Sequence, residues 1–167
     1  SNYATAESPD ICSTIMNGES GQYRANSFPE GTTSLTLIAK KQVGVIEYSI
    51  DGGSSWTQVD LSTGGSVSIS ALNVTSSAFN LWINYVSGTV ELYGLIHRAG
   101  ANGALVHKLG ATGSTAQQWA AQVTSPAFKE GIAEIKPNAV AIMLATNDQT
   151  GSRDPKKLKA DIKTIID

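Results

Sequence analysis

The hydrophobic and polar positions of this chain follow two different patterns. Between residues 1 and 98, apolar residues alternate with polar ones in short segments separated by clusters of Gly, Ser and Thr. A period of two is typical of strands that bury one face. The segments are Ser34–Ala39, Gly44–Ile50, Ser66–Ser70, Phe79–Val86 and Thr89–Ile96. This number of short strands joined by turns predicts an antiparallel β-sandwich.

After Asn102 the pattern changes to continuous apolar runs between segments of helical spacing. The runs Ala104–Leu109 and Ala139–Leu144 are typical of buried parallel strands. The helical segments are Ser114–Val123, Phe128–Ile135 and Lys156–Ile166. We expect Asp154 to cap the last helix, with Pro155 in its first turn. The alternating order predicts a parallel-sheet α/β unit with right-handed crossovers.

The change of pattern divides the chain into a β-module, residues 1–98, and an α/β part, residues 99–167. Two parallel strands and their helices cannot cover both faces of a sheet, and a doubly wound domain ordinarily has more strands. The last expected helix reaches Asp167 without a Gly or Pro stop. We therefore expect the α/β part to be incomplete at its C-terminal side and to need the missing remainder of its domain.

The charge of the chain excludes some classes of partner. Its 12 Lys and Arg residues and 14 Asp and Glu residues give a net charge of −2, which argues against binding to nucleic acid or to an anionic membrane. No apolar run is long enough to cross a membrane. The single cysteine, Cys12, excludes an internal disulfide. His97 and His107 lack further ligands at metal spacing, so we expect no metal site.

One motif of the β-module is specific by its spacing. The segment Ser49–Trp56 matches the Asp-box pattern, Ser-x-Asp-x-Gly-x-x-Trp, of sialidase-like propellers. A propeller would need several copies at a regular period, and the chain has one. We therefore interpret the motif as a stabilised hairpin. Asp51 accepts hydrogen bonds from the turn, Gly52 and Gly53 supply positive φ, and Trp56 packs back beneath it.

Two short motifs follow the expected parallel strands, where open α/β sheets place their chemistry. They are Leu109-Gly110-Ala111-Thr112-Gly113-Ser114 and Leu144-Ala145-Thr146-Asn147-Asp148. Together they resemble the second and third blocks of the SGNH (GDSL-like) hydrolases, which have a flavodoxin-like α/β domain. The resemblance implies that the Gly113 backbone N–H and the Asn147 side-chain amide form an oxyanion hole. Asp148 is expected to support this loop through backbone hydrogen bonds.

The chain departs from the family pattern at three places. Ala145 stands where the third block usually has Gly, which adds a methyl group near the turn. The Gly-Asp-Ser block of the nucleophile and the Asp-x-x-His block of the base are absent, and Ser20 is better interpreted as a surface turn residue. We therefore expect the nucleophile and the base to come from missing sequence or another chain, and this chain alone to be inactive.

The β-module resembles, more loosely, the jelly-roll carbohydrate-binding-like modules of some SGNH esterases, including phage tail-spike and tail-fibre deacetylases. In that group the module lies between the first and second hydrolase blocks. The resemblance implies a polysaccharide or acylated glycan as partner, no cofactor, a place outside the cell or on the virion surface, and a homotrimer if the parent is a phage tail protein.

Exposed aromatic residues are candidates for stacking on sugar rings. Alternation in Phe79–Val86 places Trp82 with Asn80 and Asn84 on the less apolar face. Trp82, with Trp56, is thus the substrate-binding candidate, although we favour packing in the core or between domains for both.

Three functions remain open. The favoured one is an esterase or deacetylase that removes acyl groups, chiefly acetyl, from a polysaccharide by serine nucleophilic catalysis. The second is a non-catalytic carbohydrate-binding or attachment module, and the third is a structural interaction domain of a surface or virion assembly.

Overall fold

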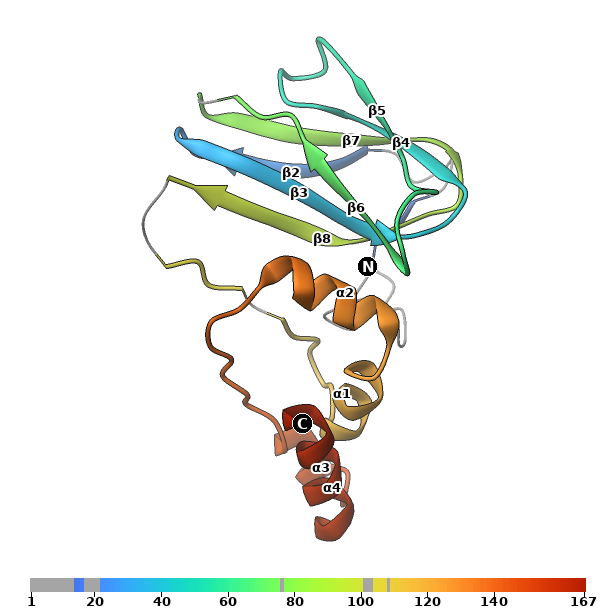
Figure 1. Cartoon of the computed structure of the whole chain (residues 1–167), viewed down its shortest axis with the longest axis vertical. Coiled ribbons are helices and arrows are strands. Elements are labelled where there is room, and N and C mark those ends of the chain that lie inside the picture. The colour runs from blue at the N-terminus through green and yellow to red at the C-terminus, as the bar shows by residue number, and fades with distance from the viewer. Residues whose placement is uncertain (1–13, 17–21, 76, 101–103, 108) are drawn as a thin grey trace. The chain divides into compact units, whose positions relative to one another are not determined.

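The protein is described by a computed structural model that covers residues 14–16, 22–75, 77–100, 104–107 and 109–167. These residues form two compact units, drawn in Figure 1. The described residues up to His107 make the β unit, and residues 109–167 make the helical unit. The expected division after residue 98 therefore lies at the end of the last strand, and the β unit extends beyond it.

The β unit consists of two four-stranded sheets whose strands pair in antiparallel fashion (Figure 1). The first sheet has the order β1 (Thr14–Met16), β8 (Val90–Ala99), β3 (Thr32–Lys40), β6 (Val67–Leu72). The second has the order β2 (Gln22–Phe28), β7 (Phe79–Gly88), β4 (Gly44–Ser49), β5 (Thr57–Asp60). The predicted antiparallel β-sandwich is confirmed.

Alternating side chains of both sheets meet in one hydrophobic core. In β7, Phe79, Leu81 and Ile83 are buried, whereas Asn80 is exposed and Trp82 is half-buried, as the period-two pattern predicts. The core also takes side chains from β3, β4 and β8. Each fully buried side chain of this size contributes about 1.5–3 kcal/mol, so alternation accounts for the stability of the sandwich.

The Asp-box segment forms the predicted hairpin turn between β4 and β5. The Ser49 hydroxyl donates to Asp51 Oδ1 at 2.7 Å, and the Ser55 N–H donates to the same oxygen at 3.0 Å. Gly52 and Gly53 have φ of +75° and +90°. Trp56 Nε1 donates to the Gly53 carbonyl at 3.0 Å, which closes the turn.

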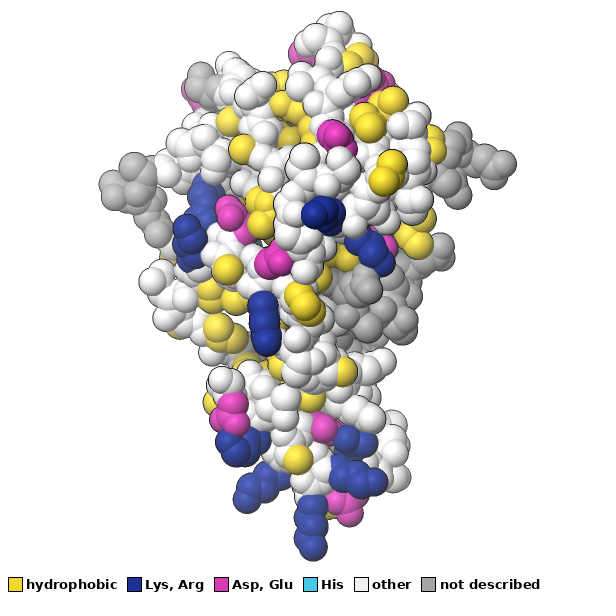
Figure 2. All heavy atoms as spheres, turned by 45° about the vertical axis from the view of Figure 1, so that its right-hand side comes forward, with side chains coloured by type: hydrophobic (Ala, Val, Ile, Leu, Met, Phe, Trp, Pro, Cys, Tyr) yellow, Lys and Arg dark blue, Asp and Glu magenta, His cyan; other side chains and the backbone are white. Residues whose placement is uncertain are grey.

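The helical unit contains α1 (Ala116–Gln122), α2 (Pro126–Ile135), α3 (Thr146–Thr150) and α4 (Pro155–Ile166). The three predicted helices are confirmed, and Asp154 caps α4 by accepting from the N–H groups of Lys156 and Lys157. In the described part of the chain no helix has the length and apolar content to cross a membrane. Figure 2 shows Lys and Arg side chains gathered over α4 among acidic ones, as on a solvated face.

The two expected parallel strands are not formed, which corrects the prediction for this part of the chain. Residues 104–107 and 139–144 have no strand structure. Val106, Val140 and Met143 are 86%, 72% and 95% exposed. A strand needs a neighbour for its backbone hydrogen bonds, and no described residue pairs with these segments. Apolar sequence alone was therefore not enough to make a sheet.

Candidate active site

The structure brings together the loops that carry the two hydrolase-like motifs. Gly113 has φ of +81° in the turn before α1, and the Ser114 N–H donates to the Ala111 carbonyl at 3.1 Å. Asn147 lies in the short helix α3. Its Nδ2 donates to the Ser114 carbonyl at 2.9 Å. The third-block amide therefore contacts the residue directly after the second-block glycine.

Both predicted donors belong to exposed residues. Gly113 and Asn147 are exposed. The Gly113 N–H has no hydrogen-bond partner among the described residues, and the Asn147 amide has a second hydrogen that its bond to Ser114 does not use. One main-chain and one side-chain donor thus lie in adjoining loops with hydrogen-bonding capacity left for a ligand oxygen.

Asp148 lies beneath this surface and fastens the two loops together. Its side chain is 2% exposed, and Oδ2 accepts from the Ala116 N–H at 2.8 Å. Its main-chain carbonyl accepts from the Arg153 N–H at 2.9 Å. Oδ1 has no hydrogen-bond partner among the described residues. The expectation that Asp148 supports its loop through backbone bonds is in accord with this geometry, and the bond to Ala116 extends that support to α1.

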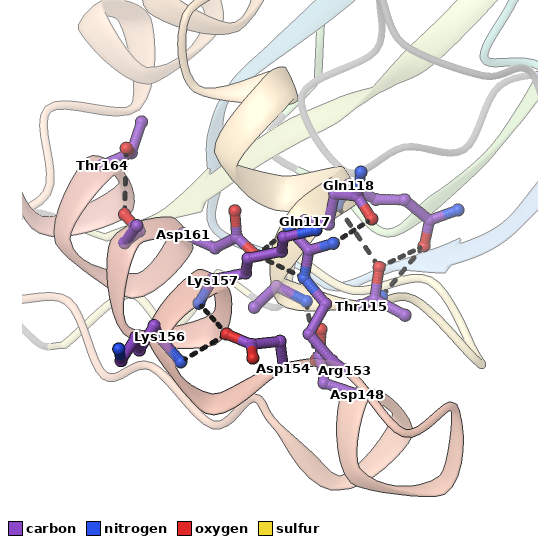
Figure 3. A network of polar contacts seen from close by, with 12 residues as sticks. Thr115, Gln117, Gln118, Asp148, Arg153, Asp154, Lys156, Lys157, Asp161 and Thr164 are labelled. Carbon is purple, nitrogen blue, oxygen red and sulfur yellow. Dashed lines mark hydrogen bonds and ion pairs between the residues drawn. The ribbon is translucent and has the colours of Figure 1, made fainter.

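A partly buried ion pair holds the helices next to these loops. Figure 3 shows Asp148, Arg153 and the start of α1 in one polar network. Arg153 Nη2 lies 2.6 Å from Asp161 Oδ2 in α4, and Arg153 Nη1 donates to Gln117 Oε1 in α1 at 2.9 Å. Because one planar guanidinium spans both helices, it fixes α1 relative to α4.

Ala145 adopts a strained backbone conformation at the start of α3. Its φ of +88° and ψ of −19° place it in the left-handed region, where a side chain costs about 1–3 kcal/mol. This is the position where the resemblance leads one to expect glycine. The backbone thus keeps the conformation that glycine would adopt freely, although alanine occupies the position.

The histidines belong to the β unit and not to the helical unit that carries this loop cluster. His97 belongs to β8 in the β unit, where its Nε2 lies 3.0 Å from Thr32 Oγ1 and its ring meets Phe28 edge-on at 5.2 Å. His107 also belongs to the β unit. The described residues contain no group of three or more His, Cys, Asp or Glu that could hold a metal. Ser20 and Cys12 lie outside the described residues.

The indole of Trp82 is packed between neighbours on the outer face of the second sheet. Trp82 pairs with Arg24 of β2 and Ser49 of β4. The Arg24 guanidinium carbon lies 4.6 Å from the ring centre. A side-chain carbon added to Gly53 would lie 3.1 Å from Cζ3 of Trp82, so the Asp-box turn contacts the ring as well. This geometry supports a packing role for Trp82 and Trp56.

A polar row crosses the same sheet face beside Trp82. Gln22 Nε2 donates to Asn84 Oδ1 at 2.9 Å, and Asn84 Nδ2 donates to Glu47 Oε1 at 3.2 Å. Arg24 Nε donates to Gln22 Oε1 at 2.7 Å. Sequence reasoning missed Gln22, Arg24 and Glu47, because their proximity depends on the register of three strands.

No protein-family model, curated protein or solved structure matches this chain.

Proposed function

We propose that this chain is part of an SGNH-type carbohydrate esterase or deacetylase. It would hydrolyse acyl groups, chiefly acetyl, on a polysaccharide, with Gly113 and Asn147 as the oxyanion hole. The serine nucleophile and histidine base come from polypeptide outside this chain, so the chain alone is inactive. The observation that carries the proposal is the 2.9 Å hydrogen bond from Asn147 Nδ2 to the carbonyl of Ser114, the residue that follows the exposed Gly113.

The chemistry follows from the placement of these donors. A serine hydroxyl attacks the acyl carbon, its proton passes to the histidine, and the carbonyl oxygen takes the negative charge of a tetrahedral intermediate. Two fixed N–H donors stabilise that charge without reorganising. The intermediate then expels the sugar oxygen or nitrogen, which takes the proton from the histidine, and water releases the acyl group from the serine. No step needs a cofactor.

The exposed apolar run of the helical unit supports an α/β domain completed elsewhere. Val140, Ile142 and Met143 are exposed in a segment without strand structure. Both sides of this run are apolar, as in strands of a parallel sheet that is covered on both faces. In the parent protein this segment would be a strand, and the two motif loops would follow the carboxyl ends of neighbouring strands.

A second function, a non-catalytic carbohydrate-binding or attachment module, is favoured by the outer face of the second sheet. The row of Gln22, Asn84 and Glu47 presents amide and carboxylate groups beside the Arg24–Trp82 stack. Such groups bind sugar hydroxyls. We propose that the parent, under either function, acts on a polysaccharide outside the cell or on a virion surface, and that it is a homotrimer if it is a phage tail protein.

Replacing Asn147 in the full-length protein tests the first proposal. We expect Asn147→Ala to lower the turnover of an acetylated polysaccharide by about a hundredfold or more, with little change in KM, because one oxyanion donor is lost. Gln149→Ala, an exposed residue of the same short helix, is the matched control and should keep full turnover. Unchanged turnover in Asn147→Ala would remove the esterase proposal. Loss of glycan binding in Arg24→Ala would then favour the binding module.

A further inference from the structure

The loops of the two motifs are joined at two points by consecutive residues. Asn147 donates from its side chain to the Ser114 carbonyl, and Asp148 accepts on its side chain from the Ala116 N–H. The first bond lies at the exposed surface and the second is buried. A single bond between two loops would leave the Asn147 amide free to rotate about it. A second, buried bond one residue away restricts that rotation.

Stability alone gives a poor reason for the Asp148 carboxylate. A buried carboxylate is costly unless its oxygens are hydrogen-bonded, yet Oδ1 has no partner among the described residues. Arg153, whose backbone N–H donates to the main-chain carbonyl of Asp148, pairs its guanidinium with Asp161 and not with the Asp148 carboxylate. Ala145, three residues earlier, is held in the left-handed region. Unsatisfied buried groups and backbone strain are found at functional sites, and this loop has both.

We propose that Asp148 is a positioning residue, which aims the Asn147 amide by clamping the third-block loop to the Ala116 N–H. This inference rests on the proposed oxyanion hole. Asp148 itself touches no substrate. Its carboxylate sets where the exposed amide and the Gly113–Ser114 turn stand relative to one another.

The hydrogen bond between Ala116 and Asp148 can be removed in this chain by replacing either its acceptor or its donor. Asp148→Ala removes the acceptor. Ala116→Pro removes the donor, and proline is suited to the first helical position after Thr115, whose φ of −109° and ψ of 160° are extended. Asp148→Asn keeps an acceptor oxygen and is the rescue variant. Asp154→Ala is the matched control, because it removes a carboxylate that accepts backbone N–H groups at the start of α4.

Nuclear magnetic resonance of the side-chain amides gives the readout. In Asp148→Ala and Ala116→Pro we expect the two Asn147 amide proton signals to move toward the positions of a free asparagine. Exchange of the Asn147 amide protons with solvent should become at least about tenfold faster. Asp148→Asn should restore both properties, and Asp154→Ala should leave them unchanged.

Two results would overturn the proposal. One is an Asn147 amide that keeps its signals in both clamp variants, and the other is unfolding of the helical unit in both, which would make Asp148 a folding residue. In the full-length esterase, Asp148→Ala should lower kcat at least about tenfold with less change in KM. Because the amide signals do not depend on catalysis, failure of the clamp and failure of the esterase function are told apart.

Discussion

The two units use their apolar residues in opposite ways. In the β unit, alternate apolar side chains such as Leu81 and Ile83 are fully buried between two sheets. In the helical unit, the longest apolar run leaves Val140 and Met143 largely exposed. The apolar segments of the β unit pair with neighbouring strands among the described residues, whereas the apolar run of the helical unit pairs with none of them. Hydrophobic pattern therefore predicts where a strand is able to form, and a neighbouring strand decides whether it forms.

The largest change in the free energy of unfolding is expected when a core side chain of the β unit is truncated, and the matched truncation in the exposed run of the helical unit is its control. Ile83→Ala should lower the free energy of unfolding of the β unit by about 2–5 kcal/mol, because it leaves a cavity in a close-packed core. Val140→Ala in the exposed run should change that of the helical unit by less than about 0.5 kcal/mol. Hydrogen exchange of each unit's own amides measures both values separately.

The Val140→Ala variant also tests whether the apolar run forms a strand in the full-length protein. In the full-length protein, Val140→Ala should become as costly as a core substitution if the run joins a parallel sheet. A cost that stays below about 0.5 kcal/mol there would show that the run is a surface loop. The contrast between the units would then be intrinsic to their sequences.

Local chemistry made much of the fold predictable. Alternation in β7 set the buried face, Gly52 and Gly53 marked the Asp-box turn, and Asp154 marked the start of α4. Strands β1, β2 and β5 were not among the predicted segments. β1 has three residues, and the sequence of β2, Gln-Tyr-Arg-Ala-Asn-Ser-Phe, is largely polar because it is an edge strand paired only with β7 among the described strands.

The candidate site was predictable in its residues but not in its connections. Gly113, Asn147 and Asp148 were identified from two short motifs, and the structure brings their loops together. The bond from Ala116 to Asp148 could not be predicted, since it depends on how a short helix packs against a loop far along the chain. For the same reason the Arg24–Trp82 stack needed the strand register.

A smaller change in stability is expected when the backbone strain at Ala145 in the third-block loop is relieved. Ala145→Gly should raise the free energy of unfolding of the helical unit by about 0.5–1 kcal/mol, because φ of +88° suits glycine and strains alanine. Ala139→Gly, in the exposed run, is the matched control and should be neutral or slightly destabilising. Hydrogen exchange of the amides of the helical unit measures the difference. A loss of stability in Ala145→Gly would show that the loop does not hold this conformation in solution.

The Asp-box turn provides the corresponding test in the β unit, through pH. The hydroxyl and the backbone N–H of Ser55, and then the Ser49 hydroxyl, donate to Asp51 and hold the pKa of its carboxyl well below the ordinary range. A lowered pKa means that the carboxylate stabilises the fold above the pKa of the unfolded chain, about 3.9, and that this contribution is lost as the pH falls below that value. The stability difference between wild type and Asp51→Asn should therefore be constant above about pH 5 and shrink steadily toward about pH 2. Ser55→Ala, which removes the strongest donor, should show a smaller decline. Urea unfolding followed by the NMR signals of the β unit across this range gives both curves. A pH-independent difference would mean that the turn is held by its glycines and Trp56 rather than by the charge of Asp51.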